Sequence, residues 1–183
     1  MLVRLVCLVL FLAAVPTHTL AGAPARPDAT PSLVVTVLLE KTIFQVDVVS
    51  LELWLGPETT LEVRHHLAAG TDSLAAAVAG SRDAWARLVF QRDVSLDRFL
   101  TGVTEDMQRA VHAGLLDAAD YTRVSADLLR WLAPLRERGI AKGDGFTYAI
   151  ADGTLRVVFT RQDGEVIIDQ TDAGPAHRRA LLG

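Results

Sequence analysis

The stretch IFQVDVVSLELWL, residues 43–55, decides how this chain folds. Its β-branched and aromatic residues predict a long, largely buried β-strand. Side chains alternate strictly between the two faces of a strand, yet the polar side changes face between Val48 and Val49. A β-bulge at this point, or passage from one covering layer to another, would reconcile the pattern. The polar positions are Gln45, Asp47, Ser50 and Glu52.

The N-terminal segment predicts export. Arg4 precedes an apolar run over residues 5–15, and Ala21-Gly22-Ala23 fits a cleavage site. This is the layout of a signal peptide over residues 1–23, because the apolar run is too short to span a bilayer comfortably. An uncleaved N-terminal anchor is the alternative. We expect a periplasmic or secreted protein with no membrane span after cleavage.

Composition excludes several classes of site. The chain has 183 residues, enough for one domain with a proper core, and its only cysteine is Cys7. A processed protein would therefore have no disulfide, no thiol nucleophile and no cysteine metal site. There are 18 basic and 22 acidic residues, and the basic ones are scattered, which disfavours nucleic acid as a partner.

The remaining pattern predicts an α+β domain over residues 32–183 after a Pro/Ala-rich linker at 24–31. The order is strands, helices, strands and a final helix, which favours an antiparallel sheet with helices on one face. Two amphipathic helices are predicted, one capped by Ser95 and one kinked by Pro134. Strands are predicted over 33–39, 43–55, 61–67 and 85–94, and hairpin strands within 146–170. Tight turns are predicted at Asp152-Gly153 and Asp163-Gly164. Helices are predicted over 71–81, 95–116, 117–139 and in a segment from Asp172.

Three segments together resemble the chalcone isomerase-like family. They are KTIFQVDVVSLELWL (41–55), LVFQRDVSLDRFLTGVTEDM (88–107) and GIAKGDGFTYAIADGTLRVVFTRQDGEVIIDQ (139–170). The order and spacing of the three carry the resemblance, which covers residues 33–183. It implies an open-faced sandwich, a large antiparallel sheet with helices packed on one face and a cleft between them. Enzymes of the family close a flavanone ring without a cofactor, and other members bind fatty acids in the same cleft.

Catalytic positions carried over from the family differ in this sequence. The family's Thr falls on Asp47, its Tyr on Phe99 and its Asn on Asp106, and no Arg lies between Arg26 and Arg64. A guanidinium stabilises a phenolate by directed, charge-assisted hydrogen bonds, whereas a carboxylate would repel it. The residues therefore favour a protein without this catalytic activity.

We expect the domain to bind a small apolar or amphipathic ligand such as a fatty acid, with no cofactor and no metal. An intramolecular lyase acting on another substrate, recognisable by Asp47 converging with Lys41 or Asp106, is one alternative. An envelope interaction protein with a filled cleft is another. A carboxylate ligand would need a cation, with Lys41, Arg98 and Arg109 as candidates. The predicted ligand-binding residues are Lys41, Asp47, Phe99, Val103, Asp106, Met107, Leu128 and Trp131, although the aromatic stripe on the second helix also fits a core.

The histidines do not predict a metal site. His65 and His66 are adjacent and would point to opposite faces of the strand predicted over 61–67. His112 and His177 have no companions at ligand spacing, so packing or surface roles are expected. No phosphate-binding or dinucleotide-binding glycine pattern is present in the sequence.

Overall fold

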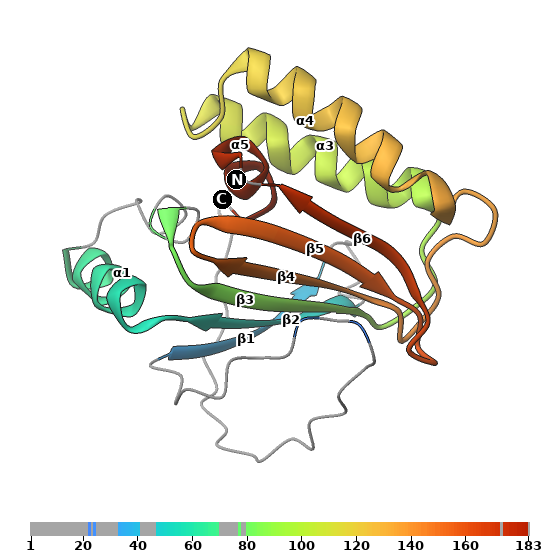
Figure 1. The fold of residues 1–183 in the computed structure, drawn as a ribbon, viewed down its shortest axis with the longest axis horizontal. Coiled ribbons are helices and arrows are strands. Elements are labelled where there is room, and N and C mark those ends of the chain that lie inside the picture. Colours follow the sequence, from blue (N-terminus) through green and yellow to red (C-terminus); the bar gives the residue numbers. More distant parts are fainter. Residues whose placement is uncertain are drawn as a thin grey trace.

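The computed structural model describes residues 33–40, 47–69, 81–172 and 174–182, together with Gly22, Pro24, Ala77 and Gly80. Within these residues, an antiparallel sheet of six strands runs in sequential order, and the predicted α+β class is confirmed (Figure 1). The strands are β1 (Leu33–Glu40), β2 (Asp47–Leu55), β3 (Ala84–Phe90), β4 (Gly145–Ala151), β5 (Thr154–Thr160) and β6 (Val166–Asp172). The helices are α1 (Pro57–Ala69), α3 (Leu96–His112), α4 (Ala118–Trp131), the 3-10 helix η1 (Ala133–Leu135) and α5 (Pro175–Leu182).

The β-bulge expected in the first long strand is present in the pairing of β1 with β2. Leu39 pairs with Val49, but Glu40 pairs with Asp47, so Val48 has no partner across this ladder. One extra residue on β2 shifts the alternation by one position. The change of polar face that the sequence shows at this point therefore follows from the register of the sheet.

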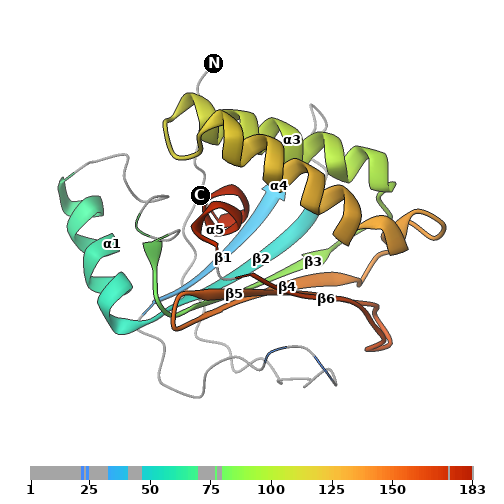
Figure 2. The same cartoon turned by 45° about the horizontal axis from the view of Figure 1, so that its top comes forward.

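The helices α3 and α4 lie side by side over one face of the sheet, and α5 lies between them and the strands (Figures 1 and 2). The Ser95 hydroxyl caps α3 by accepting from the Arg98 backbone N–H at 3.3 Å, as predicted. Asp117 caps α4 in the same way, accepting from the Asp120 N–H at 2.7 Å. The helix α4 ends at Trp131, where the chain tightens into η1 around Pro134.

The hairpin of β4 and β5 has the tight turn that its Asp-Gly pair predicts. Asp152 and Gly153 both have positive φ, 51° and 77°. Two such residues make a turn whose twist matches that of the flanking strands. At the β5–β6 connection Gly164 has φ of 92°, and the pairing shifts register between Phe159 and Thr160.

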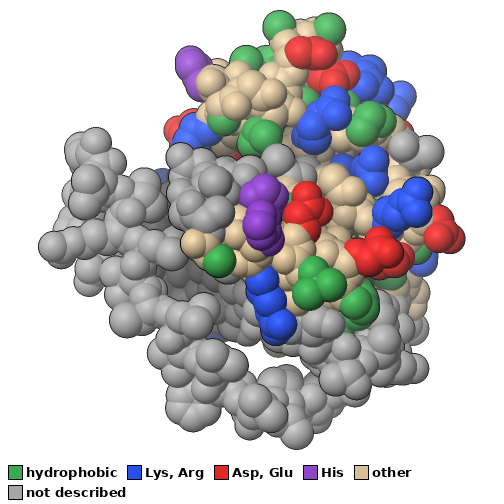
Figure 3. Space-filling model, turned by 90° about the vertical axis from the view of Figure 1, so that its left-hand side faces the viewer, with side chains coloured by type: hydrophobic (Ala, Val, Ile, Leu, Met, Phe, Trp, Pro, Cys, Tyr) green, Lys and Arg blue, Asp and Glu red, His purple; other side chains and the backbone are tan. Residues whose placement is uncertain are grey.

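The strand predicted over residues 61–67 is wrong, because this segment belongs to helix α1. A Gly-Pro pair such as Gly56-Pro57 is common in turns between strands, but Pro57 is here the first residue of the helix. Proline suits that position because the first helical N–H groups have no partner within the helix. Consequently His65 and His66 lie on a helix, with ring centroids 6.0 Å apart. Figure 3 shows the side of the molecule that carries α1, where acidic, basic and histidine side chains are interspersed.

Several other predicted boundaries also change. The strand predicted over 85–94 ends at Phe90, and Val94 forms only an isolated bridge with Ile140. Apart from Gly22 and Pro24, the predicted signal peptide and linker lie outside the described residues, as does most of the helix predicted over 71–81. None of the described helices is both long enough and apolar enough to cross a membrane.

Candidate functional site

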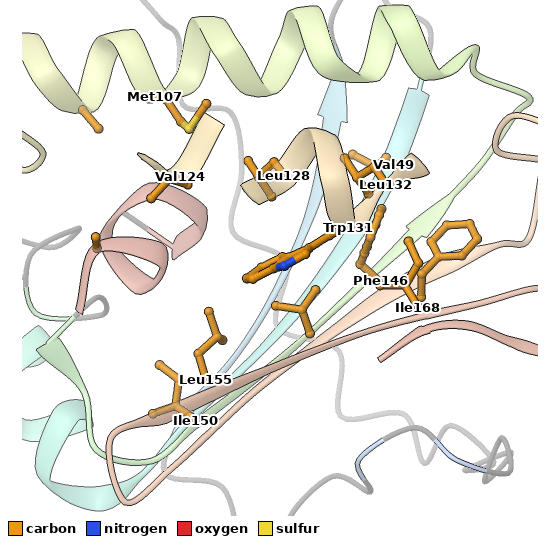
Figure 4. Close-up of a cluster of buried hydrophobic side chains, with 14 of the residues drawn as sticks. Val49, Met107, Val124, Leu128, Trp131, Leu132, Phe146, Ile150, Leu155 and Ile168 are labelled. Carbon is orange, nitrogen blue, oxygen red and sulfur yellow. The ribbon is translucent and has the colours of Figure 1, made fainter. Parts of the chain in front are cut away.

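The apolar residues predicted to line a cleft lie between the helices and the sheet. Figure 4 shows Met107, Leu128 and Trp131 directed from α3 and α4 toward the strands. Their exposed fractions are 2%, 6% and 9%, and all three belong to the main hydrophobic core. Phe99 and Val103 are half-buried and pack against the same core. The structure thus places these five predicted residues in, or packed against, one hydrophobic core.

Phe99 is part of an aromatic cluster that extends into the sheet. Its ring stacks on Phe146 of β4 at 5.3 Å between centroids, with planes 12° apart, and meets the edge of Phe90 at 5.7 Å. Phe146 in turn contacts Phe159 at 4.8 Å. Aromatic pairs at these separations add to the stability that area burial provides. Phe99 is therefore a packing residue between α3 and the sheet.

Among the described side chains, the charged residues of the predicted site do not lie in this core. Asp106 is paired with Arg109, and both side chains are more than half exposed, at 57% and 68%. Arg98 is also exposed. Asp47 is the first residue of β2, but its side chain is outside the described part of the structure, as is Lys41. Of the candidate cations, Arg98 and Arg109 thus lie on the solvent side of α3.

A groove of about 810 Å³ lies beside the N-terminus of α3. It forms because Val94 and Ile140 pair backbone to backbone, at 2.8 and 3.1 Å, and bring the segment after η1 next to the helix start. Gly139, with φ of 63°, turns the chain into this bridge. The apolar lining residues are Val94, Leu96, Leu100, Leu129 and Ile140, and the charged ones are Asp93, Asp97, Arg136, Glu137 and Arg138.

The charges around the groove are only partly neutralised. The Asp93 carboxylate accepts from the Lys142 backbone N–H at 2.8 Å. Arg136 and Arg138 are exposed, and neither guanidinium has an ion-pair partner among the described residues. Leu129, on α4, is 48% exposed. The groove therefore combines apolar side chains with two arginines and three acidic residues, a lining that has both apolar and charged parts, as an amphipathic molecule has.

A second pocket of about 460 Å³ adjoins the groove, because both are lined by Arg138 and Ala141. Its wall contains an ion pair between Asp144, which is 1% exposed, and Arg161, at 2.6 Å. The Asp144 carboxylate also accepts from the backbone N–H groups of Ala141 and Gln162, at 2.9 and 3.0 Å. Arg161 additionally donates to the Gly139 carbonyl at 2.9 Å. These bonds fix the segment that forms one side of the groove.

The buried histidine joins α5 to its neighbours. His177 is 2% exposed, with Nδ1 2.6 Å from Asp172 and Nε2 3.3 Å from Asp127. Its ring stacks on Trp131 at 4.7 Å. The packing role expected for this histidine is observed. Across the described ranges, no three histidine, cysteine or acidic side chains are grouped so as to hold a metal ion.

Tyr148 is expected to make the stability of the core depend on pH. Burial raises the pKa of its phenol above the usual value of about 10. Since the folded state holds the proton more tightly than the unfolded state does, this stabilisation is present below about pH 10 and is lost as the pH rises further.

We expect the free energy of unfolding to fall more steeply above about pH 10 in the wild type than in Tyr148→Phe. Urea titrations at several alkaline pH values measure this, with Tyr121→Phe as control; equal slopes in all three proteins would contradict it.

No local sequence signal marked the groove. Its two walls are separated in the chain by most of α3 and by α4. They are joined by the bridge of Val94 with Ile140 and by the bond from the Lys142 N–H to Asp93. Pro134 and Gly139 indicated where α4 ends, but not where the following segment returns.

No model of a known protein family matches the chain, and no curated protein matches it either.

Proposed function

We propose that this protein is an exported, non-catalytic domain with a chalcone isomerase-like fold that binds an apolar or amphipathic small molecule such as a fatty acid. The antiparallel sheet, with α3 and α4 across one face and three strands and a helix after them, supports this fold. The signal-type segment over residues 1–23 supports export.

The groove beside α3 is the observation that carries the binding proposal. Its volume, about 810 Å³, lies in the range typical of small-molecule sites. An acyl chain would lie against Leu96, Leu100 and Leu129, and burying these surfaces removes apolar area from water. A carboxylate head group would then reach Arg136 and Arg138, whose guanidinium forks match its two oxygens. The ligand site is thus proposed at the end of α3 rather than in the helix–sheet interior.

An envelope interaction protein with a filled cleft is the second candidate. It is favoured by the packing of Phe99, Met107 and Trp131 into the core, because side chains that contact one another leave less surface for a ligand. The two candidates differ in whether the outer groove is occupied.

Two substitutions test the groove directly. Leu129→Asp places a charge on the apolar wall, and Arg138→Glu reverses the charge at the head-group end. We expect each to weaken dodecanoate binding at least about tenfold, since a lost apolar contact or charged hydrogen bond contributes 1.5 kcal/mol or more. Both side chains are exposed, so the fold should persist. Isothermal titration calorimetry gives the affinities, and native mass spectrometry of the purified wild type shows whether a ligand is already bound.

Matched controls lie elsewhere on the surface. Leu61 is 67% exposed on α1, and Arg98 is exposed on α3 without lining the groove. Leu61→Asp and Arg98→Glu should bind dodecanoate like the wild type. Equal weakening by the controls would remove the groove as the site. A wild type that purifies without ligand and binds neither dodecanoate nor a flavonoid would favour the interaction protein.

A further inference from the structure

The groove beside α3 and the pocket that adjoins it are lined by side chains of different chemistry in a definite order. Arg138 lines both cavities and so stands where they meet. Asp163 and Glu165 line only the pocket. The leucines line only the groove, and they are Leu96, Leu100 and Leu129. A molecule that extends from the groove into the pocket therefore meets an apolar surface first, a guanidinium next and carboxylates last.

The carboxylates at the pocket end have no cationic partner among the described residues. Glu165 is exposed, and its side chain takes part in no ion pair there. Asp163 is also exposed and accepts from the Glu165 backbone N–H at 3.0 Å, a bond that fixes the turn but supplies no positive charge. The other acid and base that line the pocket, Asp144 and Arg161, are paired with each other at 2.6 Å. The pocket thus presents two carboxylates that an incoming cation can meet.

The acidic residues of the groove are placed differently from those of the pocket. Asp93 accepts from the Lys142 backbone N–H at 2.8 Å. Asp97 lies in the first turn of α3, where the partial positive charge of the helix N-terminus favours a carboxylate. Glu137 is next to Arg138 in the chain. Carboxylates nonetheless outnumber guanidinium groups around the two cavities, so a purely anionic head group is attracted by Arg138 but repelled by the charges around it.

We propose that the two cavities together bind a free, single-chain amphiphile with a zwitterionic head group, in which a phosphate carries a quaternary ammonium. The alkyl chain lies against the leucines of the groove, the phosphate accepts from Arg138, and the ammonium faces Asp163 and Glu165. A guanidinium fork matches two phosphate oxygens. A quaternary ammonium has no N–H to donate, so it needs only nearby opposite charge and no particular hydrogen-bond geometry. The inference rests on the proposed function, because it names the ligand class of the same groove.

Three probes with the same alkyl chain separate the parts of the head group. They are dodecylphosphocholine, dodecyl phosphate and dodecanoate, titrated below their critical micelle concentrations and at low ionic strength, where exposed charges are least screened. We expect isothermal titration calorimetry to show that the wild type binds dodecylphosphocholine at least about fivefold more tightly than either other probe, the factor that exposed charge contacts typically supply.

The double variant Asp163→Asn/Glu165→Gln tests where the ammonium lies. It removes both charges but keeps the side-chain shapes, and the asparagine retains an oxygen for the backbone N–H of residue 165, so the fold should persist. We expect it to bind dodecylphosphocholine about fivefold more weakly than the wild type does, and dodecyl phosphate no more weakly. Glu58→Gln is the matched control, because Glu58 is exposed on α1 and lines neither cavity. It should bind all three probes like the wild type.

Each contrary result points to a different error. Dodecyl phosphate or dodecanoate binding as tightly as dodecylphosphocholine would overturn the zwitterionic ligand and leave the groove as a site for a simple anionic amphiphile. A preference for dodecylphosphocholine that survives in the double variant would overturn the place given to the ammonium. Binding to phosphatidylcholine vesicles in a sedimentation assay, without binding of the monomeric probe, would overturn the free single-chain ligand. If none of the three probes binds, the proposed function fails and this inference fails with it.

Discussion

Replacing Asp144 with alanine is expected to lower the free energy of unfolding by about 3–5 kcal/mol. The substitution leaves the Arg161 guanidinium, whose side chain is 11% exposed, without its carboxylate. It also removes the acceptor for the backbone N–H groups of Ala141 and Gln162. A buried charge without a partner is far more costly than the pair is favourable, so the loss should exceed that of an ordinary surface substitution.

Urea denaturation of Asp144→Ala beside Glu137→Ala measures this effect. Glu137 is exposed on the same segment, and its removal should change stability by no more than about 0.5 kcal/mol. The double variant Asp144→Ala/Arg161→Leu should recover part of the loss, because it removes both charges together. If the single and double variants were equally unstable, the uncompensated arginine would not be the cause.

Replacing Phe146 with alanine should lower stability by a similar amount, about 3–5 kcal/mol. Phe146 is 2% exposed and stands at the centre of the aromatic cluster. Its ring lies 4.8 Å from Phe159 and 5.3 Å from Phe99, between centroids. Truncation would remove both contacts and leave a cavity between the sheet and α3, which the surrounding strands cannot fill without separating.

Thermal and urea unfolding of Phe146→Ala and Phe146→Leu show whether the loss of stability comes from the cavity that truncation leaves. The leucine variant keeps most of the side-chain volume and should lose less than half as much stability. Phe99→Leu, on the exposed edge of the same cluster, is expected to lie between the wild type and Phe146→Ala. Equal losses for the alanine and leucine variants would argue against a cavity as the cause.

Much of the fold follows from local patterns in the sequence. The change of polar face between Val48 and Val49 predicted either a β-bulge or a change of covering layer, and the register of β1 with β2 shows the bulge. The turn at Asp152-Gly153 was predicted from the need for two positive φ values. Ser95 marked the start of α3 because its side chain can accept from a free helix N–H.

Helix α1 was missed because its sequence has features of both helix and strand. Leu61 and Val63 alternate with charged residues as in a strand, and the pair Gly56-Pro57 is common in turns. The same proline also suits the first position of a helix, and local pattern alone does not choose between these structures. Here the helix fills the connection between β2 and β3.

The predicted site illustrates a different limit. Helical periodicity predicted that Met107 and Leu128 face inward, but periodicity does not distinguish a residue that packs from one that binds. The groove forms where the segment that follows α4 comes back to the N-terminus of α3. Arg136 and Arg138 belong to no periodic pattern in the sequence that could have marked it. The resemblance to chalcone isomerase-like proteins placed Asp106 in a cleft, whereas the structure pairs it with Arg109 on the exposed side of α3.

The order of the strands gives one junction in this sheet a special role in assembly. Each strand pairs with its neighbour in sequence, but residues 91–144 separate β3 from β4 and contain α3 and α4. Closing a loop of that length is less favourable in chain entropy than closing a four-residue turn by on the order of 2 kcal/mol. Gly145 opens β4 at this junction, and a side chain there would lie 2.6 Å from the Leu88 carbonyl oxygen. The sheet thus consists of two halves, β1–β3 and β4–β6. Pairing β3 with β4 requires closing the loop of residues 91–144 and bringing the two backbones so close at Gly145 that only glycine fits.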